Sequence, residues 1–261
     1  MAEPPRTDEF YVNYLPTPPA LRRVLVLVTG LLLWVAAAYA FVWARAQHGP
    51  GDAVWDDVTP KTFTGTLVAD PYPMLLPESA AEPSAATSAA GGVDPAMPII
   101  LVEMGKHGSR ERVTPHAGRR VTVRGWTLER DGRRVVELDP ADDAITPAEG
   151  VATVPAAVPA GPVTLAGEIV DYKCFLGAMK PGEGKPHKMC ATLCVRGGIP
   201  PMLVVNEPAG RAYYLLTGPA GEPIGEGVLP FIADPVEVRG SVEARAGLRL
   251  LRINPDDIRR R

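Results

Sequence analysis

The three cysteines of this chain, Cys174, Cys190 and Cys194, all lie within residues 171–198, together with His187, one of only four histidines. Thiolates and imidazole bind zinc and copper(I), and three cysteines with one histidine form a common tetrahedral zinc site. The sequence therefore predicts a metal site made of Cys174, His187, Cys190 and Cys194.

The spacing of these residues indicates how they could meet. His187, Cys190 and Cys194 are separated by three and then four positions, so on an α-helix they would form one stripe. Gly197 follows where such a helix would end. Cys174 comes earlier, at the end of a predicted strand. A strand end that faces the helical stripe would bring all four side chains to one centre.

The spacing matches no zinc-finger, haem or ferredoxin pattern, so it does not select one metal. Zinc and copper(I) are both candidates, copper(I) because the soft thioethers of Met179 and Met189 lie nearby, and an iron–sulfur cluster is a further alternative. Cations near a cysteine lower its pKa and favour the thiolate that binds metals. The segment supplies several cations, namely Lys173, Lys180, Lys185, Lys188 and Arg196.

An uncharged apolar run at residues 24–43 predicts a single transmembrane helix. At about 1.5 Å per residue, such a run spans the roughly 30 Å hydrocarbon core of a bilayer. Arg22 and Arg23 precede it, so the positive-inside rule places residues 1–23 in the cytoplasm and the main body in the periplasm of a bacterial inner membrane. A cleavable signal peptide, with residues 44–46 as its cleavage site, is the alternative.

An exported chain enters an oxidising compartment, where cysteines can pair as disulfides. A bridge from Cys174 to Cys190 or to Cys194 would fasten the segment, leave one free thiol and exclude a metal. The same thiols could instead carry out thiol–disulfide redox chemistry. The sequence leaves both alternatives open beside the metal site.

The exported part contains an internal repeat. Residues 121–142 align without gaps with residues 236–257, and each copy has the alternation and the turn of a β-hairpin. Residues 62–70 resemble residues 164–172 in the same way. With 29 prolines and 26 glycines in the chain, short strands and turns are expected instead of a helical bundle.

We therefore predict a mainly all-β fold, in which the transmembrane helix is followed by two tandem domains, residues 55–147 and 163–258, joined by a linker at residues 148–162. About five strands per domain suit a small closed barrel, with a β-sandwich as the alternative. The phrase V-x-V-x-G-x-V at residues 236–242 is similar to strands of periplasmic OB-fold proteins. This resemblance implies OB-like barrels, the second with a short helix in its Cys/His loop.

The first copy also has a long connection, residues 73–97, which is rich in Ala, Ser and Pro, and its part 78–97 is expected to be disordered. An alignment of residues 98–103 with residues 200–205 gives this connection the same position in the fold as the cysteine segment. The site would then be an addition to one of two scaffold copies.

The segment's pattern, D-x-K-C-x-x-G-x-M-x-P-G followed by H-x-x-C-A-x-x-C and G-G-I-P-P, resembles a motif of uncharacterised bacterial membrane-anchored proteins. The sequence contains no glycine-rich phosphate loop and no G-x-S-x-G elbow, and a net charge of −3 would not attract nucleic acid.

We therefore expect a protein without catalytic residues: an accessory subunit or metal-handling assembly factor of a membrane redox complex, with membrane-protein partner subunits. A thiol–disulfide redox enzyme and a structural scaffold with a disulfide-stapled loop are the alternatives.

Overall fold

The structure is a computed structural model that describes residues 17–46, 53–77, 96–208 and 210–261. These residues belong to two compact units, within Met1–Gly49 and Pro50–Arg261. Most of the predicted cytoplasmic tail and most of the loop predicted to be disordered, residues 78–97, lie outside the described residues.

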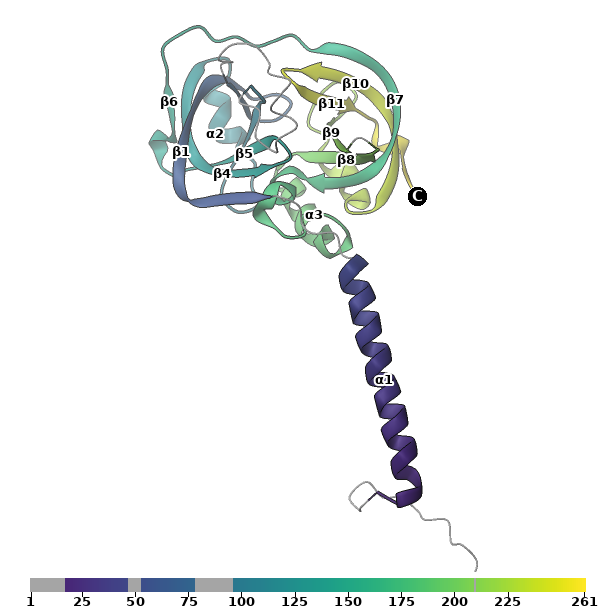
Figure 1. Ribbon diagram of the computed structural model, residues 1–261. Coiled ribbons are helices and arrows are strands. Elements are labelled where there is room, and N and C mark those ends of the chain that lie inside the picture. The colour runs from purple at the N-terminus through teal and green to yellow at the C-terminus, as the bar shows by residue number, and fades with distance from the viewer. Residues whose placement is uncertain (1–16, 47–52, 78–95, 209) are drawn as a thin grey trace, which may run out of the picture. The chain divides into compact units, whose positions relative to one another are not determined.

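Helix α1 (Pro19–Ala46) belongs to the first unit (Figure 1). Its stretch Leu21–Arg45 has a mean hydropathy of 2.4 and no buried part. The helix is therefore long and apolar enough to span a membrane, and it contains the predicted residues 24–43. The predicted orientation and compartment stay predictions.

The first half of the body is a closed β-barrel. Around the ring, β1 (Val54–Val68), β2 (Met74–Pro77), β3 (Ile99–Val102), β5 (Arg133–Leu138) and β4 (Arg120–Arg130) follow one another, and β4 pairs back onto β1. The pair β3–β5 is parallel and the other pairs are antiparallel. β6 (Ile145–Pro147) pairs with β4 outside the ring.

The second half repeats this strand order. Its ring consists of β7 (Val158–Asp171), β8 (Pro201–Glu207), β9 (Gly210–Thr217), β11 (Leu248–Arg252) and β10 (Pro235–Arg245), with β12 (Ile258–Arg260) on β10. Again one pair, β9–β11, is parallel. Closure pairs the edges that an open sheet would expose. The prediction of an all-β fold with two small OB-like barrels is confirmed, although β7 begins inside the predicted linker.

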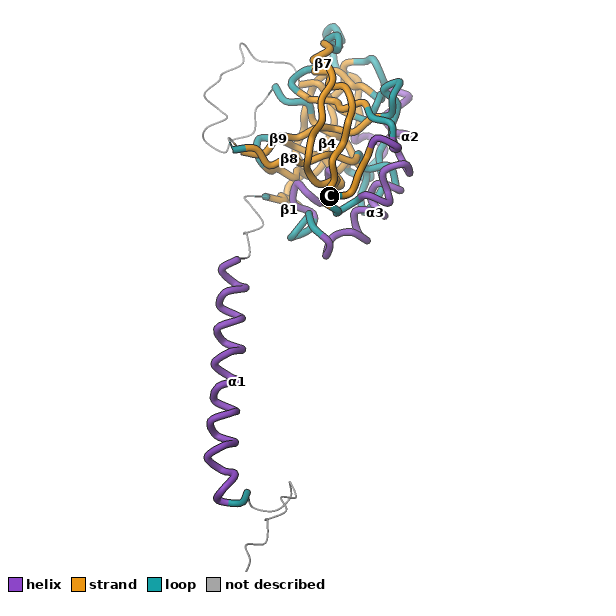
Figure 2. The backbone as a smooth tube through the Cα atoms, turned by 90° about the vertical axis from the view of Figure 1, so that its right-hand side faces the viewer, coloured by secondary structure: helices purple, strands orange, loops and turns teal. Residues whose placement is uncertain are grey.

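Short helices connect the strands. Figure 2 shows two of them, α2 and α3, on the same side of the barrels. The short helical segments of the body are α2 (Arg110–Val113), η2 (Thr114–His116), η3 (Asp142–Ala144), η4 (Cys174–Ala178), η5 (Lys185–His187), α3 (Lys188–Arg196), η6 (Gly225–Phe231) and η7 (Pro255–Asp257).

The strand order corrects the predicted match between the two long connections. β3 is the third strand of its ring and β8 is the second, so residues 98–103 do not correspond to residues 200–205. The cysteine segment joins the first two strands of its barrel, and in the first barrel that connection is only residues 69–73. The alignment was wrong because the buried parts of short strands share one apolar pattern whatever their place in the sheet.

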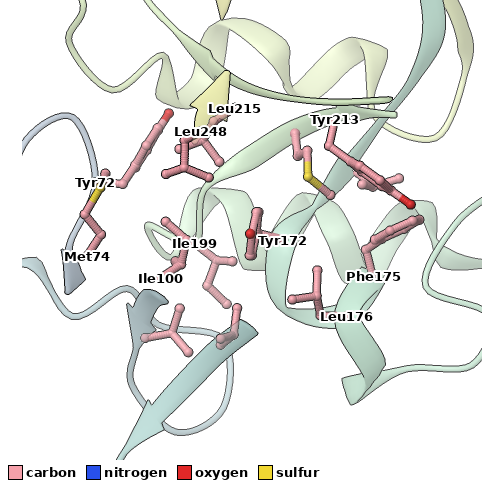
Figure 3. Close-up of a cluster of buried hydrophobic side chains, with 14 of the residues drawn as sticks. Tyr72, Met74, Ile100, Tyr172, Phe175, Leu176, Ile199, Tyr213, Leu215 and Leu248 are labelled. Carbon is pink, nitrogen blue, oxygen red and sulfur yellow. The ribbon is translucent and has the colours of Figure 1, made fainter. Parts of the chain in front are cut away.

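The two barrels share one hydrophobic cluster in addition to their separate cores. Each has its own filled interior, and a third cluster draws side chains from both (Figure 3). Tyr72 and Ile100 of the first barrel lie there with Tyr172 and Leu215 of the second, and the Tyr72 hydroxyl donates to the carbonyl of Leu216 at 2.8 Å. Burying one such side chain is worth about 1.5–3 kcal/mol, so the shared cluster holds the barrels together as one body.

A buried ion pair joins the barrels at the start of the cysteine segment. Lys173 Nζ lies 2.7 Å from Glu137 Oε2 on β5, and the two side chains are only 4% and 7% exposed. The ammonium also donates to the carbonyls of Glu103 at 3.0 Å and Gly105 at 2.8 Å, just after β3. Two hydrogen bonds and one ion pair thus hold the ammonium. The residue before Cys174 is therefore fixed to the first barrel.

Replacing Glu137 by Gln should leave the Lys173 ammonium buried without a counter-charge. Removing one partner of a buried ion pair costs about 3–5 kcal/mol, and we expect a loss of unfolding free energy of that order. Urea unfolding of the full chain in detergent measures this loss. Glu129→Gln is the matched control, because it breaks the more exposed pair with Arg134 and should cost less than about 1 kcal/mol. Equal losses in both variants would contradict a special role for the buried pair.

Candidate metal centre

The centre is built on the connection from β7 to β8. β7 ends at Asp171, which is fully buried and whose Oδ1 accepts a hydrogen bond from the Cys174 amide at 2.8 Å. This contact fixes the first turn of η4. The predicted short helix is present as α3, but His187 closes the turn η5 directly before it, and Cys174 opens η4 instead of ending a strand.

The sulfur of Cys174 is close to both other cysteine sulfurs. Its distance is 3.9 Å to Cys190 Sγ and 3.7 Å to Cys194 Sγ, and all three cysteines are free. Two thiolates that share one tetrahedral ion, with bonds near 2.3 Å, lie about 3.8 Å apart, whereas bonded sulfurs lie at about 2.05 Å. The spacing fits three sulfurs that could bind one ion, and the disulfides considered above are not formed.

His187 is oriented for a ligand on its free side. The ring is 2% exposed, and its Nε2 lies 2.9 Å from Asp171 Oδ2. Its Nδ1 is buried and has no hydrogen-bond partner in the described chain. A carboxylate on one nitrogen of a metal-binding histidine fixes the tautomer and leaves the other nitrogen to the ion. Nδ1 is thus the ring nitrogen that would face a bound ion.

The structure gathers the four predicted ligands in two overlapping groups. Cys174, His187 and Cys190 form one group whose ligand atoms lie within 4.8 Å of one another, and Cys174 and Cys194 form the other with Asp171. Cys174 is common to both. Sequence reasoning did not place Asp171 in the site, although its position at the end of the strand before Cys174 could have suggested it.

A lysine of the first barrel completes the centre. Lys106 lies in the loop after β3, and its Nζ is 2.6 Å from Cys190 Sγ and 3.7 Å from Cys194 Sγ. The contact with Cys190 raises the pKa of Lys106, so the cation is stabilised beside the sulfurs. Nothing in the sequence near Lys106 marks it as a site residue, because its contact crosses between the barrels.

The protons of the thiols are distributed unequally. The pKa of Cys194 is lowered, chiefly because Cys174 donates a hydrogen bond to its sulfur, and Lys106 adds to this effect. The pKa of Cys174 is raised by the same hydrogen bond and by burial. Binding of a metal at Cys174 would displace its proton and relieve both effects.

Three of the five cations in the segment pair with carboxylates away from the sulfurs. Lys173 pairs with Glu137, Lys188 Nζ lies 2.8 Å from Asp234 Oδ2, and Arg196 is 3.9 Å from Glu226. The expectation that these three cations flank the sulfurs is wrong, because each side chain reaches a carboxylate elsewhere. The cation at the sulfurs is Lys106 instead.

The glycine after α3 lets the two barrels approach at the site. A Cβ added to Gly197 would lie 1.9 Å from the carbonyl oxygen of Lys106, and the Gly108 amide donates to the Gly197 carbonyl at 2.8 Å. Any larger residue at Gly197 would push away the loop that carries Lys106. The glycine predicted as a helix end is therefore also a close contact between barrels.

One side of the centre is open to solvent. Cys174 and Cys194 are 4% and 1% exposed, whereas Cys190 is partly exposed. Three methionines on the same loops have exposed side chains: Met104 at 52%, Met179 at 45% and Met189 at 73%. The other described methionines are buried or packed against the core, namely Met74, Met97 and Met202. Among the described residues, the exposed thioethers thus lie on the segments that carry Lys106, Cys174 and Cys190, the last of these being helix α3.

The chain matches no protein-family model, and no curated protein or solved structure is significantly similar to it. The function must therefore follow from the residues of the site itself.

Asp171→Asn should weaken metal binding without removing a ligand. The amide cannot hold the His187 ring as the carboxylate does, and losing such a partner costs about 10–100-fold in metal affinity. Competition with a chelator of known affinity measures the change. Asp234→Asn is the control, since it alters the Lys188 contact of the same segment but not the ring, and should leave affinity unchanged. An unchanged affinity in Asp171→Asn would contradict the assignment of Nδ1.

Proposed function

We propose that this protein holds one soft metal ion at Cys174, His187, Cys190 and Cys194 and serves as a metal-handling assembly factor of a membrane redox complex. The observation that carries the proposal is the position of the Cys174 sulfur, 3.9 Å and 3.7 Å from the other two. The buried, unpartnered Nδ1 of His187 offers the fourth ligand.

The partial exposure of Cys190 and the soft thioether sulfurs of the exposed methionines favour copper(I) over zinc. A structural zinc site is closed on all sides, whereas the partly exposed Cys190 offers a ligand that an incoming donor or acceptor can reach. Thioethers select copper(I), and Met189, which precedes Cys190 in α3, and Met179 in the same segment have exposed side chains. An iron–sulfur cluster spreads its cysteines over two or more irons, which fits three close sulfurs less well.

The proposed setting is the periplasmic face of a bacterial inner membrane. Support comes from the apolar helix α1, with Arg22 and Arg23 at its N-terminal side. Soft ions are inserted into membrane redox complexes, so we propose partner subunits within that membrane. A permanent accessory subunit of such a complex would use the same centre to hold its ion instead of passing it on.

Thiol–disulfide exchange is a second candidate, favoured by the contact of Lys106 with Cys190. A cation beside a partly exposed sulfur stabilises the thiolate that attacks disulfides. Cys190 would attack a substrate disulfide and release one substrate thiol. Cys174, 3.9 Å away, would then attack Cys190, which forms a Cys174–Cys190 disulfide and releases the second substrate thiol.

Metal loading of the full chain in detergent tests the proposal. Under anaerobic, reducing conditions we expect one copper(I) per chain, measured by elemental analysis and by competition with bathocuproine disulfonate. His187→Ala should lower the affinity at least tenfold, whereas His116→Ala, a partly exposed histidine away from the centre, should not change it. No bound ion, together with reduction of a model disulfide by the free thiols, would replace this function with thiol exchange.

The exposed methionines should affect the rate of ion transfer more than its equilibrium. Changing Met104, Met179 and Met189 together to Leu keeps their volume but removes the thioethers. We expect the copper(I) affinity to stay within about twofold and transfer to a competing chelator to slow severalfold, measured by stopped-flow absorbance. Met97→Leu, away from the centre, should leave the rate unchanged. An unchanged rate in the triple variant would remove the methionines from the function.

A further inference from the structure

A cleft that none of the cysteines lines lies between the two barrels. Its volume is about 300 Å³, and three arginines line it. Arg133 comes from β5 of the first barrel, Arg211 from β9 and Arg249 from β11 of the second. Glu207 is the one acidic residue among the described residues that line it. Three guanidinium groups thus border the cleft together with one carboxylate. We call this site the arginine cleft.

Two of these arginines lack a carboxylate partner in the described part of the chain. Arg133 donates to the carbonyl of Asp131 at 2.8 Å, and its guanidinium stacks on the Tyr213 ring at 3.8 Å. Arg249 contacts only the hydroxyl and ring of Tyr214. Arg211, the third, reaches Glu183 at 3.2 Å.

Other arginines on the barrels, by contrast, pair closely with carboxylates. Arg124, Arg134 and Arg252 each contact a carboxylate oxygen at 2.6 Å. Arg133 has lost much of its hydration in exchange for an aromatic ring, and burial lowers its pKa. A cation that gives up water without gaining a counter-ion is unfavourable, and an anion brought into the cleft would relieve the cost.

Stacking on tyrosine explains the position of Arg133 by itself but not the arrangement of the three side chains. Cation–π contacts need one arginine and one ring, whereas here guanidinium groups from three strands and both barrels border one cavity. Guanidinium groups bind oxyanions through paired hydrogen bonds, and several around one cavity are typical of phosphate and carboxylate sites.

We propose that the arginine cleft binds a small oxyanion with two or more negative charges, of the phosphate or polycarboxylate class. The volume of about 300 Å³ is at the lower end of small-molecule sites and suits such a ligand. Arg133 and Arg249 supply the uncompensated charge. Glu207 adds one negative charge to the lining, which disfavours a longer polyanionic chain. The proposal does not depend on the metal centre.

Calorimetric titration of the full chain in detergent tests it, with inorganic phosphate, citrate and soluble dihexanoyl phosphatidic acid as probes. Binding of phosphate or citrate, weakened as sodium chloride is raised, is the expected result. Binding of the short-chain lipid alone would assign the cleft to a lipid headgroup and overturn the small-ligand proposal. The absence of binding by all three probes would overturn it as well.

Variants separate the cleft from general surface charge. Arg133→Gln and Arg249→Gln should each weaken binding at least tenfold. Arg133→Lys should restore only part of it, because lysine keeps the charge but loses the planar pair of donors. Arg239→Gln, on the exposed side of β10, is the charge-matched control and should bind like the parent. Equal weakening in Arg239→Gln would overturn the site.

Folding is checked on each variant by its unfolding midpoint. Should Arg133→Gln fail to fold, Arg249→Gln decides, because Arg249 is exposed and its replacement leaves the core intact. An affinity unchanged in Arg249→Gln would then count against the proposal.

Discussion

The buried ammonium of Lys173 is the contact on which the metal centre depends. Its partners, the Glu137 carboxylate and the carbonyls of Glu103 and Gly105, all belong to the first barrel, although Lys173 itself continues from β7 of the second. Moving this cation out of its site would leave the buried Glu137 carboxylate without a counter-charge, which is costly. Because Cys174 is the next residue, the position of the sulfur that contacts both other sulfurs is set by the packing of the two barrels.

A second lysine crosses the same boundary in the opposite direction. Lys106 extends from the loop after β3 to Cys190, while Lys173 binds carbonyls of that same loop. The Gly108 amide adds a hydrogen bond to Gly197 at the end of α3. The loop is thus held at both sides of the sulfurs, and the centre belongs to the boundary between the barrels and not to the second barrel alone. The sequence predicted a site added to one of two scaffold copies, but residues of both barrels contact the cysteine segment.

Much of the fold and part of the centre could be predicted from the sequence. Alternation and turn residues indicate the hairpin of β10 and β11 directly, and the helical spacing brings Cys190 and Cys194 to one side of α3. Local patterns of this kind carry information about neighbours along the chain. The role of Lys106 could not be predicted in this way, because its partners are more than eighty residues away and an ordinary surface lysine has the same local sequence. The wrong match of the two connections also arises because local patterns do not show a strand's place in the sheet. β2 and β3 are both so short and apolar that no pattern separates them, and β8 was therefore matched with β3 instead of with β2.

The boundary also brings the arginine cleft close to the cysteine segment. Phe175 follows Cys174, and its ring packs edge-on against Tyr213 with centroids 5.8 Å apart (Figure 3). Arg130 stacks on Phe175 at 4.0 Å and Arg133 on Tyr213 at 3.8 Å, so two guanidinium groups of the first barrel enclose an aromatic pair of the second. A ligand that fixes Arg133 would also restrict Tyr213, and through it the ring beside Cys174. Packed side chains with few alternative positions transmit such restrictions, and coupling between two sites is typically about 1–3 kcal/mol. The Phe175–Tyr213 pair therefore connects the lining of the arginine cleft with the segment that carries Cys174.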